Sequence, residues 1–170
     1  RADLYHQVGG LDPDLYAHME EVDLCWRLKN AGYRIGYIGG STVFHVGGSV
    51  ISYGSPQKLY YNFRNSLILL LKNERGSKLL WLFPLRLVLD GVAGAQMLLK
   101  GQFRETFTIV KAHFHFYGSI GKWWKRRREA QKLVSHRNEE GLFRKSIVWQ
   151  YFALKRKTFD KLNFQPRRLS

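Results

Sequence analysis

The sequence predicts an α/β portion followed by a mainly α-helical tail, and three observations lead to this expectation. Residues 1–57 combine one helical segment with two short apolar runs that are typical of strands. After Pro56 longer apolar stretches at helical spacing take over. Charge divides at nearly the same place, because residues 1–50 hold four Lys or Arg against six acids, whereas residues 51–170 hold 24 against seven. We therefore expect two parts, 1–57 and 58–170.

In the first part a helix is expected from about Tyr16 to Asn30. Asp12-Pro13-Asp14 resembles a helix entry, and Gly32 suits the residue just after a helix end, where a left-handed backbone is common. The apolar positions on one side of this helix are Val22, Cys25, Trp26 and Leu28.

Two short strands are expected next, at Arg34–Ile38 and Thr42–Val46. Both runs alternate or cluster apolar residues, and Gly39-Gly40 between them is typical of a turn. A glycine-rich loop follows at residues 47–48.

In the second part Lys58–Asn73 is expected to form a helix. Leu79–Lys100 is strongly apolar but is interrupted by Pro84, Arg86 and Asp90. A spanning helix needs about 20 consecutive apolar residues, so this stretch is expected to lie in a membrane interface or in a core.

Composition limits the classes of protein. The chain of 170 residues is 45% hydrophobic, which is enough for a sizeable core, and its net charge is +15. A single cysteine, Cys25, excludes an internal disulfide and favours a reducing compartment. The basic second part is expected to face something anionic. Because Arg1-Ala-Asp-Leu shows neither a leader nor an initiator methionine, we expect the chain to begin inside a longer protein.

The densest cluster of acids is Glu20, Glu21 and Asp23. A structural interpretation is available, because acids in a first helical turn stabilise it by about 0.3–1 kcal/mol each and Asp23 can pair with Arg27 at i,i+4. A functional interpretation is that one carboxylate acts as a general base for an acceptor hydroxyl. His45, at the end of the second expected strand, could then complete a metal or diphosphate site.

The run GGLDPDLYAHMEEVDLCWRLKNAGYRIGYIGGSTVFHVGGS, together with YYNFRNSLILLLKN, resembles the C-terminal part of the catalytic domain of family 2 glycosyltransferases. The resemblance implies the GT-A fold and transfer of a sugar, usually with inversion, from a nucleotide donor to an acceptor. It covers residues 1–73 closely and the basic tail more loosely.

The resemblance also implies roles for the acids. The Glu-Asp pair of the family falls on Glu20 and Glu21, and its second member is the usual catalytic base, so Glu21 is the expected base. Asp23 matches the next acidic position and is expected to order the site, partly through Arg27. Glu in place of Asp at position 21 keeps the carboxylate and lengthens its reach.

The same resemblance assigns the surrounding positions. Gly9, Gly10 and Asp12 match the loop near the transferred sugar, which makes them candidate substrate-binding residues. His45 matches a histidine that meets the metal or diphosphate in several relatives, although a structural histidine remains an alternative. The implied cofactor is a divalent metal, Mg or Mn.

Two motifs of the family are absent from this sequence. Without an Asp-x-Asp motif the main metal ligands and the nucleotide-binding half are expected upstream of Arg1, so the chain is expected to be the acceptor-side part of an enzyme and inactive alone. Without a Gln-x-x-Arg-Trp motif a single sugar is expected to be transferred. A glycan or lipid-linked acceptor in cell-surface polysaccharide or glycoconjugate synthesis would fit.

Aromatic and basic residues alternate in the tail, and three interpretations remain open. The helices could simply be solvated, with their leucines in a core. They could lie on an anionic membrane surface, at the cytoplasmic face of the membrane, because interfacial helices have this composition. A non-catalytic basic module that binds lipid or nucleic acid is the alternative function, although no motif for specific nucleic-acid binding is present. The aromatic anchors are Trp81, Phe103, Phe107, Phe114, Phe116, Tyr117, Trp123 and Trp124.

Overall fold

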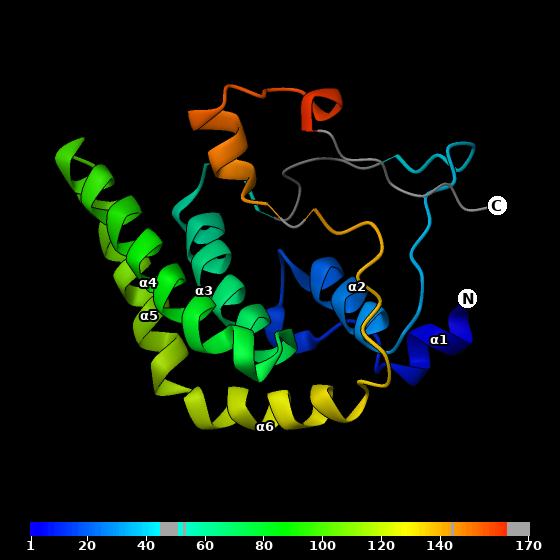
Figure 1. Cartoon of the computed structure of the whole chain (residues 1–170). Helices are drawn as coiled ribbons and strands as arrows, with labels where there is room; N and C mark the ends of the chain where they lie inside the picture. Colours follow the sequence, from blue (N-terminus) through cyan, green and yellow to red (C-terminus); the bar gives the residue numbers. More distant parts are fainter. Residues whose placement is uncertain (45–50, 53, 144, 163–170) are drawn as a thin grey trace.

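The computed structural model describes residues 1–44, 51–52, 54–143 and 145–162, and these residues form helices and connecting loops without a strand (Figure 1). In chain order the elements are α1 Ala2–Gln7, η1 Pro13–Leu15, α2 Glu20–Asn30, α3 Pro56–Asn73, α4 Gly76–Leu99, α5 Phe103–Gly118, α6 Ile120–Lys132, η2 Trp149–Ala153 and η3 Phe159–Leu162. The η1 and η3 segments are 3₁₀ turns, and η2 is a π-helical turn.

Helix α3 is the centre of the molecule and packs against α2, α4, α5 and α6 (Figure 1). Its start is well defined, because the Ser55 hydroxyl accepts a hydrogen bond from the Lys58 amide and Pro56 occupies the first turn. The main core cluster contains Leu15, Leu67, Ile68, Leu69, Leu71, Phe116 and Trp123. The predicted helix over 58–73 is therefore confirmed, and burial of its leucine-rich part explains why it forms.

Helices α4 and α5 form a hairpin at one side of the molecule (Figure 1). The short connection between them contains Gly101 with φ of +74°, a left-handed conformation that glycine adopts without strain. Where the helices pack, the Thr106 hydroxyl donates to the Gly94 carbonyl at 3.2 Å, and the Ile109 side chain lies against Gly94. The small residue on α4 allows this close approach.

Helix α6 follows α5 after Ser119 and crosses beneath the hairpin and α3 (Figure 1). Trp123 on α6 is buried in the main core. Of the basic residues of the KWWKRRR segment, Arg126 and Arg127 are half-buried, whereas Lys122, Lys125 and Arg128 are exposed. The loop after α6 returns to α2, where the Asn138 amide donates to the Lys29 carbonyl. Segments far apart in the sequence are thereby joined.

The predicted α/β fold class, and with it the GT-A fold, is wrong, because the described part of the chain is all helical. Residues 34–38 adopt no strand, and neither do residues 42–44, while the rest of the second expected strand lies outside the described residues. Tyr37 is 89% exposed and Phe44 is 96% exposed. Two short strands are not stable without a sheet or a helix to cover them, and among the described residues no strand pairs with these segments.

The expected helix at 16–30 forms, but it begins at Glu20. It does not include Tyr16–Met19, because three of these residues have left-handed backbone angles. Gly32 follows the helix with φ of +90°, as predicted. The division at residue 57 stays a prediction, and the two parts share the buried ion pairs described below.

Candidate functional site

The loop directly before the acid cluster has a strained backbone. Tyr16, His18 and Met19 have φ values of 60°, 72° and 78°, a region that residues other than glycine rarely occupy. Each such residue costs on the order of 1–3 kcal/mol and persists only where the surroundings impose it. Backbone strain of this kind is concentrated at functional sites, so the residues that this loop positions, Glu20 and Glu21, are candidates for function.

Asn65 on α3 holds the strained loop in place. Its side chain is fully buried, and its amide nitrogen lies 3.0 Å from the Leu15 carbonyl, 3.2 Å from that of Ala17 and 2.7 Å from that of His18. Arg64 adds a bond from its guanidinium to the Asp14 carbonyl at 3.0 Å. Two adjacent α3 side chains thus satisfy carbonyls that the irregular backbone leaves without helical partners.

The loop places Glu20 and Glu21 in the first turn of α2. Glu21 is exposed, and it lies close enough to Cys25, one turn later, to influence it: burial raises the pKa of the Cys25 thiol, and the Glu21 carboxylate raises it further. Glu20 is half-buried, and among the described residues its Oε2 atom has no hydrogen-bond partner although it is shielded from solvent. Most buried polar atoms of proteins have a hydrogen-bond partner, so this oxygen is an exception.

Asp23 faces the interior instead. Its carboxylate accepts hydrogen bonds from Arg27 at 2.8 Å, from Lys72 at 2.9 Å and from the Asn73 amide at 2.8 Å. The side chain is completely buried. The ion pair with Arg27 that the spacing indicated is therefore present, and the structure adds two α3 partners to it. Because these partners occupy both oxygens, Asp23 fixes α2 onto α3.

Asp12 is engaged by the same lysine, since Lys72 Nζ lies 2.5 Å from Asp12 Oδ2. Burial raises the pKa of Asp12, but the ammonium of Lys72 more than offsets this effect and holds that pKa below its usual value. Arg27 donates to the carbonyls of Val8 and Gly10. The buried cations Lys72 and Arg27 therefore fix residues 8–12, the loop between α1 and η1. In this loop Gly10 has a positive φ of 65°, a backbone conformation that glycine adopts without strain.

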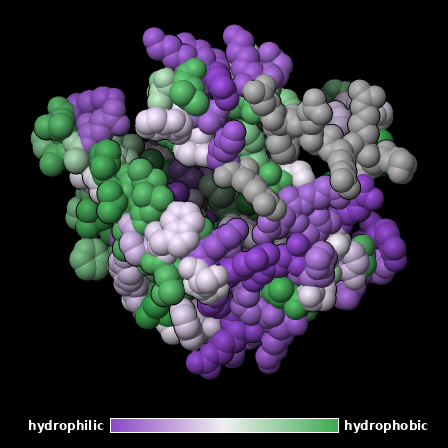
Figure 2. All heavy atoms as spheres, viewed as in Figure 1, coloured by the Kyte–Doolittle hydropathy of each residue, from purple (hydrophilic) through white to green (hydrophobic). Residues whose placement is uncertain are grey.

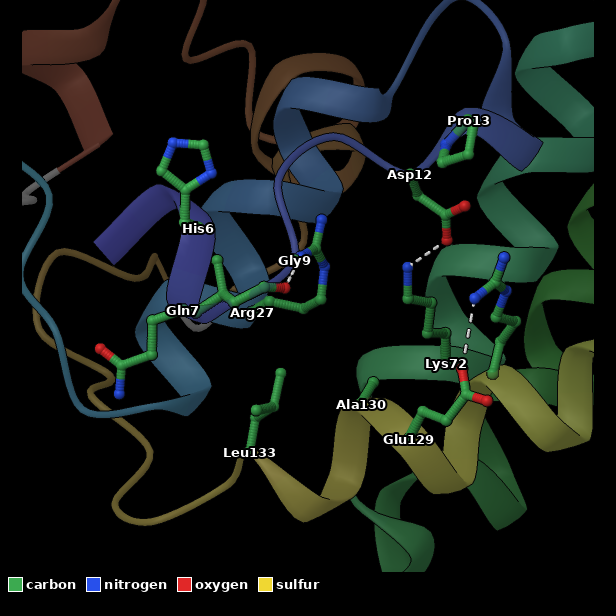
Figure 3. A pocket seen from close by; sticks show the side chains of 12 residues that line it. His6, Gln7, Gly9, Asp12, Pro13, Arg27, Lys72, Glu129, Ala130 and Leu133 are labelled. Atoms are coloured by element: carbon green, nitrogen blue, oxygen red, sulfur yellow. Dashed lines mark hydrogen bonds and ion pairs between the residues drawn. The ribbon is translucent and has the colours of Figure 1, made fainter. Parts of the chain in front are cut away.

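A pocket of about 330 Å³ lies under this loop, between α1, α2, α3 and α6 (Figure 3). In Figure 3 the Lys72 side chain points toward Asp12, and Arg27 reaches backbone near Gly9. The charges that line the pocket pair with one another or bond backbone carbonyls, so it resembles a structural junction more than a binding site. Its lining comprises His6, Gln7, Val8, Gly9, Asp12, Pro13, Arg27, Lys72, Arg126, Glu129, Ala130 and Leu133.

The described residues do not fit the divalent metal that the resemblance implies. No group of three or more His, Cys, Asp or Glu side chains converges anywhere in the described part of the chain. Asp12 and Asp23 already bind cationic side chains. His45, the expected metal ligand, lies outside the described residues.

Sequence reasoning did not identify Asn65, Lys72 and Asn73 as part of this site. The available signal was their position: these polar residues, seven and eight apart, recur on one side of a leucine-rich helix. All three are buried, and each has partners from the first thirty residues of the chain.

Comparisons with family models, with curated proteins and with solved structures found no match for this chain. The site is therefore interpreted from its own geometry and from the sequence pattern.

Proposed function

We propose that this chain provides the acceptor-side carboxylates of an enzyme that transfers one glycosyl group from a nucleotide-sugar to a hydroxyl of a glycan or lipid-linked acceptor. The observation that carries the proposal is the strained loop, held by Asn65, which presents Glu20 and Glu21 at the start of α2. The resemblance of this segment to the acidic motif of family 2 glycosyltransferases supports it. The proposal does not depend on a GT-A fold.

The proposed reaction is a single displacement. Glu21 takes the proton of the acceptor hydroxyl, and the oxygen forms a bond to the anomeric carbon of the donor sugar. The bond from that carbon to the diphosphate oxygen breaks, and the nucleoside diphosphate leaves with the electron pair. Because attack and departure occur on opposite faces of the sugar, the configuration inverts, and no covalent sugar–enzyme bond is needed.

Glu21 is the best-placed base among the acids of this region. Asp23 and Asp12 are buried in ion pairs with Lys72, and this burial blocks access to a substrate. Glu21 is exposed, so an acceptor can reach it. Glu20 is half-buried beside Glu21, and the proposal assigns it the orientation of the acceptor in place of proton transfer.

The nucleotide diphosphate and its divalent metal are not assigned to the described residues. The proposal instead assigns the binding of both groups to a part of the enzyme outside these residues. This arrangement explains why a carboxylate pair can be present without metal ligands that converge among the described residues.

The first prediction tests whether Glu21 acts as the general base. In the enzyme that contains this chain, Glu21→Gln should lower turnover by about 10²–10⁴-fold, because an amide cannot accept the proton of the acceptor. Release of nucleoside diphosphate from UDP-, GDP- and dTDP-linked sugars measures turnover, and titration calorimetry with the active donor measures its binding, which should hardly change.

Glu105→Gln is the matched control, since Glu105 is likewise an acid in the first turn of a helix, α5. It should leave turnover unchanged. Parental turnover in Glu21→Gln would remove the base role from Glu21, and an equal loss in Glu105→Gln would attribute the effect to folding.

A further inference from the structure

The outer side of the α4–α5 hairpin is an apolar face that the rest of the described chain leaves uncovered. On α4 the exposed residues recur at helical spacing, and the same is true of α5, where they are three or four residues apart along the whole helix. Together they are Trp81, Leu85, Val88, Leu89, Val92 and Leu99 on α4, and Phe103, Phe107, Val110, Phe114 and Tyr117 on α5. We call this set the hairpin face. Figure 2 shows hydrophobic side chains gathered over this part of the molecule.

A groove of about 530 Å³ joins the two stripes. Its walls come from both helices, with Gly91 and Ala95 on α4 and with Val110, Phe114 and Tyr117 on α5. A side chain at Gly91 would meet no atom within 4 Å, so the groove is open there. The two stripes are therefore parts of one apolar surface.

The ionisable side chains within the hairpin pair with one another, and two of them, Asp90 and His113, belong to the lining of the groove. Asp90 is buried, and its carboxylate lies 2.8 Å from Arg86 Nε and 3.1 Å from His113 Nε2, which links α4 to α5. The Arg86 guanidinium also lies over the Phe63 ring of α3, 5.6 Å from its centre. The two charges that interrupt the apolar sequence of α4 thus serve packing against α3 and α5.

Basic side chains flank the hairpin face. Lys100 is exposed at the tip of the hairpin. At the other end the apolar stripe continues onto α6 through Ile120 and Trp124, beside the exposed Lys125 and Arg128. Among the described residues neither Lys125 nor Arg128 forms an ion pair.

The neighbouring arginines of α6 have different tasks. Arg126 pairs with Asp14 at 2.9 Å, and Arg127 donates to the Leu71 and Glu74 carbonyls. They hold the fold together, so they are poor candidates for an external contact.

We propose that the hairpin face docks onto an anionic phospholipid bilayer, with its apolar residues among the upper acyl chains and Lys100, Lys125 and Arg128 at the headgroups. The charge of the chain favours this occupant over a second copy, because two chains of net charge +15 would repel each other, whereas anionic lipid attracts them. The inference rests on the hairpin alone and goes beyond the proposed reaction.

The hairpin is expected to lie in the interface. By length and composition α4 is the one helix of the described chain that could cross a membrane, which is weak evidence by itself. Crossing would bring Arg86 and Asp90 to the bilayer centre, at roughly 2.5–3.5 kcal/mol each on insertion scales. Docking on the hairpin face instead leaves this ion pair packed against α3 and α5.

The anchors expected from composition divide into two groups in the structure. Phe116 is completely buried and Trp123 is nearly so, and both belong to the core. The other six are exposed, five of them on the hairpin face and Trp124 on its continuation. The exposed group is the one available to lipid.

Flotation with vesicles of phosphatidylcholine, with and without phosphatidylglycerol, tests the proposal. The parent chain should bind the anionic vesicles at low salt and be partly released at high salt, because salt screens exposed charges. Phe107→Ser combined with Phe114→Ser should weaken binding by about tenfold or more, since affinity scales with buried apolar area. Lys125→Gln combined with Arg128→Gln should weaken binding to anionic vesicles only.

Tyr37→Ser combined with Phe152→Ser is the matched control, because it removes two aromatic rings that are at least as exposed but lie outside the hairpin face. It should bind as the parent does, and circular dichroism should show the same helicity in all variants. The proposal would be overturned if the parent did not bind anionic vesicles. It would also be overturned if the Phe107/Phe114 variant bound them as well as the control does. Sedimentation of the parent as a dimer that this variant abolishes, or tight binding of single-stranded RNA by a parent that floats poorly, would overturn it too.

Quenching of tryptophan fluorescence by brominated phosphatidylglycerol gives a second reading that keeps the face apolar. Trp81 and Trp124 are both about half exposed on this surface. Bound parent should be quenched, and Trp81→Phe combined with Trp124→Phe should bind but lose most of the quenching. Undiminished quenching would place another surface in the bilayer.

Discussion

Asn65 shows how one side chain can determine the geometry of a site from the opposite element. Its amide is the hydrogen-bond donor to three carbonyls of the strained loop, and it is completely buried. The neighbouring Arg64 supports the same loop through the Asp14 carbonyl. If the side chain of Asn65 or Arg64 were removed, fewer hydrogen bonds would stabilise the left-handed backbone angles at His18 and Met19.

Asn65→Leu should therefore destabilise the chain and impair the acid cluster together. A leucine of similar volume leaves the loop carbonyls without a donor, which costs about 1–3 kcal/mol for a buried unsatisfied group. Urea unfolding measures the loss, and turnover in the whole enzyme should fall at temperatures where the variant is still folded.

Asn62→Leu is the matched control for Asn65→Leu, because Asn62 lies on the same helix and is partly exposed. It should change the free energy of unfolding by less than about 0.5 kcal/mol. Equal losses in the two variants would mean that the loop does not depend on Asn65.

Local spacing predicted one residue pair correctly and missed the others for a physical reason. The Asp23–Arg27 ion pair follows from the i,i+4 geometry of a helix and is present. Lys72 and Asn65 find their partners about fifty residues earlier in the chain, and no local rule indicates which polar residue of α3 meets which loop. The proposed roles of Glu20 and Glu21 stay predictions, and His45 lies outside the described residues.

At the scale of elements, α6 is attached to the N-terminal loop through Asp14. Lys122 lies 2.6 Å and Arg126 lies 2.9 Å from its carboxylate oxygens. Burial raises the pKa of Asp14, but the hydrogen bonds from Lys122 and Arg126 more than offset this effect and hold the pKa below its usual value. The pKa of Asp12 is lowered in the same way by Lys72.

Lowering the pH should therefore weaken the ion pairs of Asp12 with α3 and of Asp14 with α6. A carboxyl whose folded pKa is below its unfolded value stabilises the fold above the unfolded pKa of about 4, and this stabilisation is lost as the pH falls through the folded pKa. The free energy of unfolding should be nearly constant from about pH 7 to 5 and fall below about pH 4.

Asp14→Asn provides the comparison in the same urea titrations. It should be less stable than the parent at neutral pH and should lose less stability on acidification, because the pKa shift of Asp14 no longer contributes. An acid slope as steep as that of the parent would show that Asp14 does not carry this linkage.

The helices of the tail and the helix α2 of the first part were predictable, whereas the described residues of the two expected strands adopt no strand. Residues 56–73 and 76–99 have long apolar patterns and defined ends, and both form helices. The runs at 34–38 and 42–46 have strand-like composition, but strand formation depends on a neighbouring strand that the described residues do not supply.

At the scale of the whole molecule, the acid cluster and the hairpin face lie on different helices that pack against α3. The acid cluster lies at α2, and the hairpin face lies on α4 and α5, with α3 packed against all three helices. An acceptor anchored in a bilayer would suit this arrangement, because one molecule would carry both a surface for lipid and a carboxylate for the reaction.

The central claim is that a single carboxylate, Glu21, promotes direct displacement at the anomeric carbon. The most direct measurement is the anomeric configuration of the product, read by proton NMR of the newly linked sugar in the whole enzyme. The account predicts inversion relative to the nucleotide-sugar, with product formation lost in Glu21→Gln. Retention of configuration, or a covalent sugar adduct on Glu21 detected by mass spectrometry, would contradict it.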